Sequence, residues 1–156
     1  MTWEILIMVN TSFFALLLAI IDFKSKILPN KYVLALSITS IILIGLASDF
    51  NFEAILRSIY VSMIIFVAYL IMFFLSKRTF GLGDVKYSFA LSLPAVFLFG
   101  IRQTINMHVS AFILGGIFAL VLLISKKVSK NHAIAFGPFM SVSYFLFLVL
   151  SLKGDY

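Results

Sequence analysis

The sequence of 156 residues contains no cysteine, and only 12% of its residues are charged. The lack of cysteine excludes disulfide bonds, thiolate metal ligands and a thiol nucleophile. In place of charge the chain has 63% hydrophobic residues and a mean hydropathy of +1.16, which is far from the composition of soluble domains. These features indicate an integral membrane protein.

Apolar segments follow one another along the whole chain and are separated by short polar loops. Because a hydrocarbon core ~30 Å thick requires a helix of ~20 mostly apolar residues, a chain of this length crosses a membrane about six times and has no room for a second domain. The period-two alternation of barrel strands is missing. We therefore expect an all-α, polytopic membrane protein with one domain over residues 1–156 and spans at about residues 3–21, 32–47, 54–75, 84–100, 107–124 and 133–152.

The N-terminal segment is predicted to be the first of these spans. It carries Glu4 in place of the basic residues that open a cleaved signal peptide. We therefore expect it to be retained.

The basic residues predict the orientation of the chain in its membrane. Nine of them belong to the first, third and fifth loops and three to the other side, so the positive-inside rule places the odd loops in the cytoplasm and both termini outside. The net charge of +6 thus reflects orientation, and nucleic-acid binding is not expected. The nine are Lys24, Lys26, Lys31, Lys77, Arg78, Lys86, Lys126, Lys127 and Lys130, and the three are Arg57, Arg102 and Lys153.

Only two acidic residues fall on the predicted cytoplasmic side. Asp22 ends the first apolar segment and Asp84 begins the fourth, so both lie at the same depth in the membrane. A carboxylate at this boundary costs a few kcal/mol unless it is paired or faces water. Two neighbouring carboxylates can share a proton, and one then activates a water molecule while the other donates the proton. This pair therefore suits aspartic proteolysis.

The residues beside the two aspartates are compatible with a site and also with a purely structural role. Gly81 and Gly83 precede Asp84 and leave space for a substrate backbone to approach. Alternatively, Asp22 could pair with Lys26 one helical turn later, and Asp84 could cap the fourth helix. The residues alone leave both interpretations open.

Other polar residues in the apolar segments are interpreted as structural. Ser88 and Ser92 follow Asp84 at steps of four, which predicts a polar stripe facing the interior of the bundle. His108 and His132 lack metal co-ligands and are expected in loops or at the membrane boundary. No serine sits in a nucleophile motif with a histidine at comparable depth, so an intramembrane serine protease is disfavoured.

Three segments resemble the signatures of the type IV prepilin peptidases and archaeal preflagellin peptidases. "IDFKSKILPNKYVLAL" has an aspartate that ends a span, a basic loop, and an Ile-Pro-Asn-like turn with Pro29 and Asn30. "FGLGDVKYSFAL" matches a Gly-x-Gly-Asp motif followed by Val-Lys, in which Lys86 is the lysine. "AIAFGPFM" is similar to a late Pro-Phe-Gly-Pro segment and contains Gly137 and Pro138. The three segments occur in the family's order across about residues 20–145.

The resemblance implies an intramembrane aspartic endopeptidase that removes short basic leaders from prepilin-like precursors at the cytoplasmic face of the cell membrane. Asp22 and Asp84 occupy the positions of the family's catalytic aspartates, and Gly81 and Gly83 match its motif glycines. The expected partners are a pilin, pseudopilin or archaellin precursor and membrane lipid. No metal or other cofactor is implied.

The sequence departs from the family pattern at a few places. Leu28 stands where isoleucine is usual, and Ala135 stands where the late segment commonly has proline. Larger relatives carry an N-terminal region whose paired cysteines bind zinc and which is associated with N-methylation of the mature pilin. This sequence has neither that region nor a cysteine, so methyltransferase activity is not expected.

Two other classes of function remain as alternatives. A small six-span transporter or channel could use Asp22 and Asp84 as a proton or cation site, although such sites are expected near the middle of the bilayer. A membrane assembly factor could bind pilin-like helices without cutting them. Position in the membrane discriminates the first alternative from a peptidase, and an activity assay discriminates the second.

Overall fold

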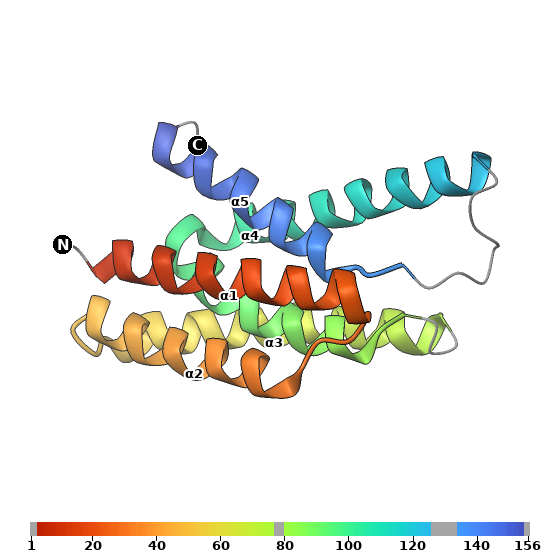
Figure 1. Ribbon diagram of the computed structural model, residues 1–156. Coiled ribbons are helices and arrows are strands. Elements are labelled where there is room, and N and C mark those ends of the chain that lie inside the picture. The colour runs from red at the N-terminus through yellow and green to blue at the C-terminus, as the bar shows by residue number, and fades with distance from the viewer. Residues whose placement is uncertain (1–2, 77–79, 126–133, 155–156) are drawn as a thin grey trace.

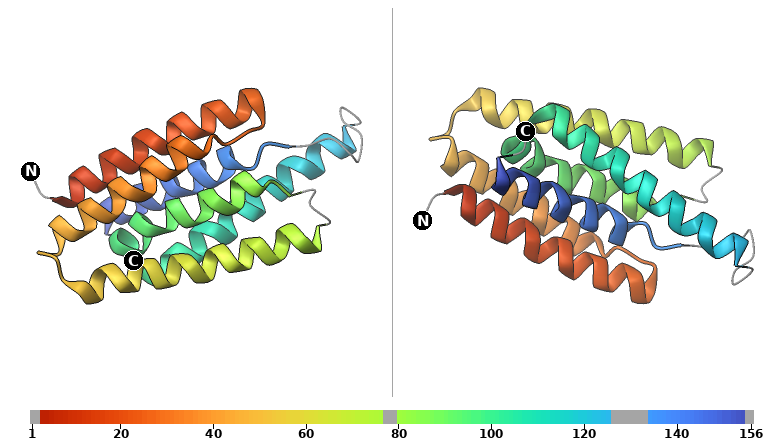
Figure 2. Two further views of the ribbon diagram at one scale, coloured as in Figure 1. Left: turned by 90° about the horizontal axis from the view of Figure 1, so that it is seen from below. Right: turned by 90° about the horizontal axis from the view of Figure 1, so that it is seen from above.

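The computed structural model describes residues 3–76, 80–125 and 134–154 and is all-α, as the sequence predicts. The described residues form five helices that pack side by side along the long axis of the molecule (Figures 1 and 2). Several residues named above lie outside the described ranges, namely the orientation residues Lys77, Arg78, Lys126, Lys127 and Lys130, and also His132. The helices are α1 (Trp3–Ser25), α2 (Asn30–Ala47), α3 (Phe52–Leu75), α4 (Leu82–Ile124) and α5 (Gly137–Lys153).

Helix α4 reverses its direction at Gly100, so the loop predicted at residues 101–106 is wrong. Gly100 has φ 80° and ψ 172°, a conformation that is open almost only to glycine, and the residues on both sides of it are helical. The side chains of Ser92 and His108 are 2.8 Å apart, whereas 16 residues of straight helix would separate them by about 24 Å. The first half of α4 (residues 82–99) and its second half (residues 101–124) are therefore antiparallel neighbours (Figure 1).

Four helices are long and apolar enough to cross a membrane, namely α1, α2, α3 and α4. Helix α5 is also apolar but has only 17 residues. Large apolar side chains point outward from the bundle, among them Phe13 at 60%, Leu34 at 61% and Leu75 at 78% exposure. A surface of this kind suits lipid and would be costly in water.

The helix ends near the two aspartates follow from local sequence. Helix α1 ends at Ser25, and Lys26 then adopts a positive φ of 55°. Pro29 is extended and precedes α2, as Gly81 precedes α4. Helix α5 has Pro138 in its first turn. A backbone N–H at this position would have no acceptor within the helix, so proline costs no hydrogen bond there. These ends bring the loop between α1 and α2 close to the start of α4.

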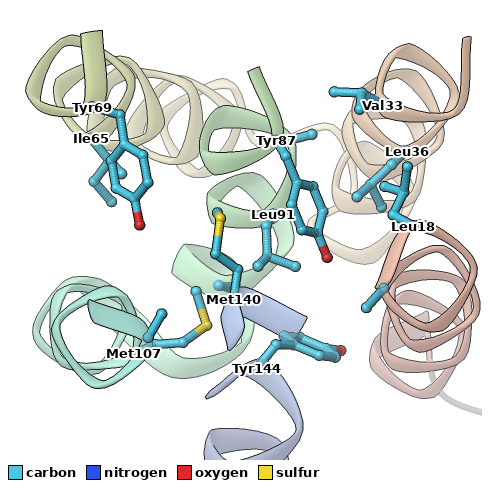
Figure 3. Close-up of a cluster of buried hydrophobic side chains, with 14 of the residues drawn as sticks. Leu18, Val33, Leu36, Ile65, Tyr69, Tyr87, Leu91, Met107, Met140 and Tyr144 are labelled. Carbon is cyan, nitrogen blue, oxygen red and sulfur yellow. The ribbon is translucent and has the colours of Figure 1, made fainter. Parts of the chain in front are cut away.

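Helix α5 packs into the centre of the core. Figure 3 shows Met140 and Leu91 in the middle of a cluster of buried side chains, with Tyr69 of α3 and Leu36 of α2 on opposite sides. Tyr87 of α4 is fully buried, and its hydroxyl lies 2.9 Å from the Oγ atom of Ser141 on α5. Ser141 in turn donates to the carbonyl oxygen of Ala15 on α1 at 2.9 Å. Packing and hydrogen bonds thus fix α5 against both α1 and α4.

Candidate active site

Asp22 and Asp84 line one cavity of about 450 Å³ at the end of the bundle. Asp22 lies in the last turns of α1 and is 4% exposed, and Asp84 lies in the first turn of α4 and is 7% exposed. Residues that lie 62 positions apart in the sequence therefore meet at one cavity. The other lining residues are Lys26, Ile27, Leu28, Pro29, Asn30, Gly81, Leu82 and Gly83.

The carboxylate of Asp22 is held by the start of α5. The backbone N–H of Gly137 donates to Asp22 Oδ2 at 2.9 Å. A Cβ atom at position 137 would lie only 2.8 Å from the same oxygen, so a larger residue cannot occupy this position without displacing the carboxylate. The partial positive charge at the start of a helix also favours a carboxylate there. The late glycine thus provides both a donor and the space for Asp22.

The two glycines before Asp84 make room for different side chains. A Cβ atom on Gly81 would lie 2.6 Å from Asp84 Oδ2, and one on Gly83 would lie 3.0 Å from the Cβ atom of Leu28. Leu28 is 6% exposed and packs the loop between α1 and α2 against α4. The sequence suggested that the space beside these glycines admits a substrate backbone. In the structure, side chains of the protein itself occupy that space.

Asp84 differs from Asp22 in its hydrogen bonds. Its Oδ1 atom is buried and receives no hydrogen bond from the described residues. Gly81, at the N-cap of α4, has no side chain, and no side-chain cap hydrogen bond forms at this helix start. The structure therefore does not support the capping role considered for Asp84. A buried polar atom without a partner is uncommon in proteins and is costly to keep.

A second cavity of about 330 Å³ reaches Asp84 from the other side of the loop that precedes α4. Its lining is mostly apolar and includes Phe80, Phe112 and Phe136, and the rings of Phe112 and Phe136 lie 4.8 Å apart between centroids. Gly81 and Asp84 line both cavities. An apolar side chain of a ligand can therefore lie directly beside the Asp84 carboxylate.

The remaining motif residues lie at different distances from the aspartates. Pro29 and Asn30 line the cavity with Asp22 and Asp84, and Pro138 follows Gly137 in α5. Lys86 does not line that cavity; its Nζ atom donates to Asn30 Oδ1 at 3.1 Å. Lys86 is therefore linked to the cavity through Asn30 and does not line it.

His108 is buried within α4, so its predicted place in a loop or at the boundary is wrong. It is 6% exposed, and its Nδ1 atom lies 2.9 Å from the hydroxyl of Tyr69. Its Nε2 atom lies 2.8 Å from Ser92 Oγ, which donates its own proton to the carbonyl oxygen of Ser88 at 2.7 Å. Nε2–H therefore donates to Ser92, and the hydroxyl of Tyr69 donates to Nδ1.

The structure places Ser92 and His108 at the same depth, although Ser92 is not part of a nucleophile motif. Ser92 nevertheless cannot serve as a nucleophile in this arrangement. It is fully buried, it lines neither cavity that contains Asp84, and its proton bonds to a backbone carbonyl. Ser88 and Ser92 do face the interior, as the sequence predicted.

Comparison with known proteins adds one finding to this geometry. The sequence model of the type IV leader peptidase family matches residues 9–120, a range that contains both aspartates and most of the chain. Neither a curated protein nor a solved structure matches the chain at a significant level. The chain is a multi-pass membrane protein that belongs to the type IV leader peptidase family, whose members are aspartic-type endopeptidases.

Proposed function

We propose that this protein cuts the basic leader peptide from type IV prepilin-like precursors at the cytoplasmic face of the membrane, with Asp22 and Asp84 as its catalytic pair. One observation carries the proposal: the two buried aspartates share a cavity at one end of the bundle. Membership of the leader peptidase family supports the same reaction. The substrate class comes from the family, and the pilin, pseudopilin and archaellin precursors are the candidates.

The proposed reaction is hydrolysis of a peptide bond by two carboxyl groups that share one proton. The ionised carboxylate takes a proton from water, and the water oxygen attacks the carbonyl carbon of the substrate. The protonated carboxyl group donates its proton to the carbonyl oxygen, which gives a tetrahedral gem-diol. The carboxyl group that took the proton from water then passes it to the peptide nitrogen, a gem-diol hydroxyl returns its proton to the other carboxylate, and the C–N bond breaks to release the leader and the free amine of the mature chain.

Gly137 orients Asp22 through its N–H. Asp84 Oδ1, which has no hydrogen-bond partner within the described ranges, can bond to water or substrate. Because two carboxyl groups that share a proton titrate together, neither aspartate alone is assigned the proton.

The proposal includes six crossings of the membrane, two of them within α4, and both termini outside. The reversal at Gly100 supports it, because the two antiparallel halves of α4 can each form one crossing. The start of α1 and the end of α5 lie at one end of the bundle, and the end of α1 and the start of α4 lie at the other (Figure 1). The cavity with the aspartates then faces the cytoplasm, where the leader of a precursor is found.

The position of the aspartates argues against the transporter alternative. A translocation site is expected near the middle of the bilayer. Asp22 and Asp84 lie instead close to the ends of their helices. The apolar cavity beside Asp84 also suits a peptidase, because the segment that follows the leader in such precursors is a hydrophobic helix.

Cleavage of defined precursors by the purified protein tests the proposal. We expect Asp22→Asn and Asp84→Asn each to lower the cleavage rate by roughly 10²- to 10⁴-fold, because an amide can neither accept nor relay the proton. Asp49→Asn is the matched control, since Asp49 is exposed in the turn between α2 and α3. Mass spectrometry of the products locates the cut in each precursor. Cleavage at the wild-type rate by either of the first two variants would exclude the catalytic pair.

A further inference from the structure

A groove of about 490 Å³ lies between α2, α3 and the first half of α4, separate from the cavity with the aspartates. Its walls are apolar and include Leu34 on α2, with Met63 and Phe66 on α3. Neither Asp22 nor Asp84 lines it. The volume falls in the range of sites that hold a small molecule, ~300–1,000 Å³.

One end of the groove is positively charged. Lys31 at the start of α2 and Lys86 at the start of α4 belong to its lining, and both precede the apolar wall residues of their helices. Asn30 Oδ1 accepts a hydrogen bond from Lys86 Nζ at 3.1 Å, and Lys31 Nζ lies 4.7 Å from the ring centre of Tyr32. The described lining contains no acidic side chain. The groove is thus apolar along its length and cationic where the helices begin.

We propose that this groove binds an anionic phospholipid, with an acyl chain between α2 and α3 and the headgroup phosphate between Lys31 and Lys86. A lipid satisfies both parts of the lining at once, since basic pockets between membrane helices bind anionic headgroups. A soluble phosphate would leave the apolar walls empty, and an uncharged helix would leave the two lysines without an anion. The proposal does not depend on the peptidase activity.

The groove adjoins the aspartate cavity at Asn30, which lines both. Lys86 lies two residues after Asp84, and Asn30 follows Pro29. An occupied groove holds the starts of α2 and α4 together, and these two segments frame the cavity with the aspartates. Because neither aspartate lines the groove, the lipid takes no part in the chemistry of that cavity.

Native mass spectrometry of the purified protein in detergent tests the charge requirement. We expect phosphatidylglycerol to be retained roughly tenfold to thirtyfold more strongly than phosphatidylcholine with the same acyl chains, from two basic residues near the headgroup. Lys31→Gln with Lys86→Gln should abolish this preference. Lys24→Gln with Lys153→Gln removes the same charge away from the groove and should preserve it. Equal retention of the two lipids by the wild type, or an equal loss in both double variants, overturns the proposal.

Fluorescence quenching tests the location, because the chain has a single tryptophan, Trp3. Met63→Trp in a Trp3→Phe background places the only indole in the groove wall, and Phe13→Trp in the same background is a control on the exposed face of α1. Phosphatidylglycerol with brominated acyl chains should quench position 63 at a lower mole fraction than brominated phosphatidylcholine. The two lipids should quench position 13 alike. If the preference for brominated phosphatidylglycerol over brominated phosphatidylcholine is the same at positions 63 and 13, the assignment to this groove is overturned.

Competition distinguishes the lipid from other occupants. Glycerol 3-phosphate alone should not restore the fluorescence at position 63, and neither should an uncharged apolar helical peptide at an equimolar amount. Displacement by glycerol 3-phosphate would mean that the lysines bind any phosphate. Displacement by the peptide would assign the groove to a protein helix. Either result overturns the proposal.

Discussion

Each of three glycines at the site makes room for one particular side chain. Gly81 leaves space for the carboxylate of Asp84, Gly83 for Leu28, and Gly137 for the carboxylate of Asp22. The distances that a Cβ atom would have, 2.6, 3.0 and 2.8 Å, are too short for unstrained contacts. These glycines therefore set the positions of the two carboxylates and of the loop between α1 and α2. They do so because they lack a Cβ atom that would clash, more than because their backbone is flexible.

Gly137→Ala should impair cleavage more than it impairs folding. The new Cβ atom would force the Asp22 carboxylate away from the N–H of Gly137, and a displacement of ~1 Å at a reacting group can cost about 10²-fold in rate. Cleavage kinetics measured beside thermal unfolding in detergent separate the two effects. Gly45→Ala is the control, because Gly45 is a tightly packed helix residue distant from the aspartate cavity. Equal rates for the two variants would contradict the positioning role.

His108→Ala should destabilise the protein by about 2–4 kcal/mol, since it leaves both the Tyr69 hydroxyl and Ser92 Oγ short of a buried partner. The measurement is equilibrium unfolding in mixed micelles. Asn106→Ala is the control in the same half of α4: its side chain is exposed, and the loss should stay within about 0.5 kcal/mol. A comparable loss of unfolding free energy in the two variants would show that the buried hydrogen bonds of His108 contribute little to stability.

Helix α4 shows what apolar patterning could predict and what it could not. The pattern located two apolar segments, 84–100 and 107–124, and both are helical. It also predicted a loop between them, because Arg102, Gln103 and Asn106 are polar. These residues are helical, and the hydroxyl of Thr104 bonds to the carbonyl oxygen of Gly100 at 2.8 Å. A glycine inside an apolar run does not reveal its φ, so the sequence could not place the reversal there.

Gly100→Ala tests whether that reversal depends on glycine. A Cβ atom at position 100 would touch nothing within 4 Å, so any cost comes from the backbone conformation and should be ~1–3 kcal/mol. Gly116→Ala is closely matched, because its Cβ atom also has no neighbour within 4 Å but its backbone is helical. That variant should be neutral or gain up to about 1 kcal/mol. Unfolding midpoints that shift equally would mean that the conformation at Gly100 carries no strain for alanine.

The site as a whole depends on which helix ends lie together. The sequence predicted that Asp22 and Asp84 share a depth, because both border basic loops, and the structure places them at one cavity. It did not predict the hydrogen bond from Gly137 to Asp22, which joins residues 115 positions apart. It also missed the pairing of Ser92 with His108, which requires the reversal of α4. Periodicity and charge report on depth and burial, whereas contacts between distant segments follow from packing.

The orientation of the whole bundle gives the last prediction, and the absence of cysteine makes it easy to test. Nine basic residues on one side against three on the other should place the aspartate cavity in the cytoplasm and the turn between α2 and α3 outside. Asp49→Cys and Lys24→Cys lie on opposite ends of the bundle, and both side chains are exposed. A membrane-impermeant maleimide should label Asp49→Cys in intact cells and Lys24→Cys only after permeabilisation, while the cysteine-free parent stays unlabelled. Labelling of Lys24→Cys in intact cells would put both aspartates on the extracytoplasmic face, where the leader of a cytoplasmic precursor cannot reach them.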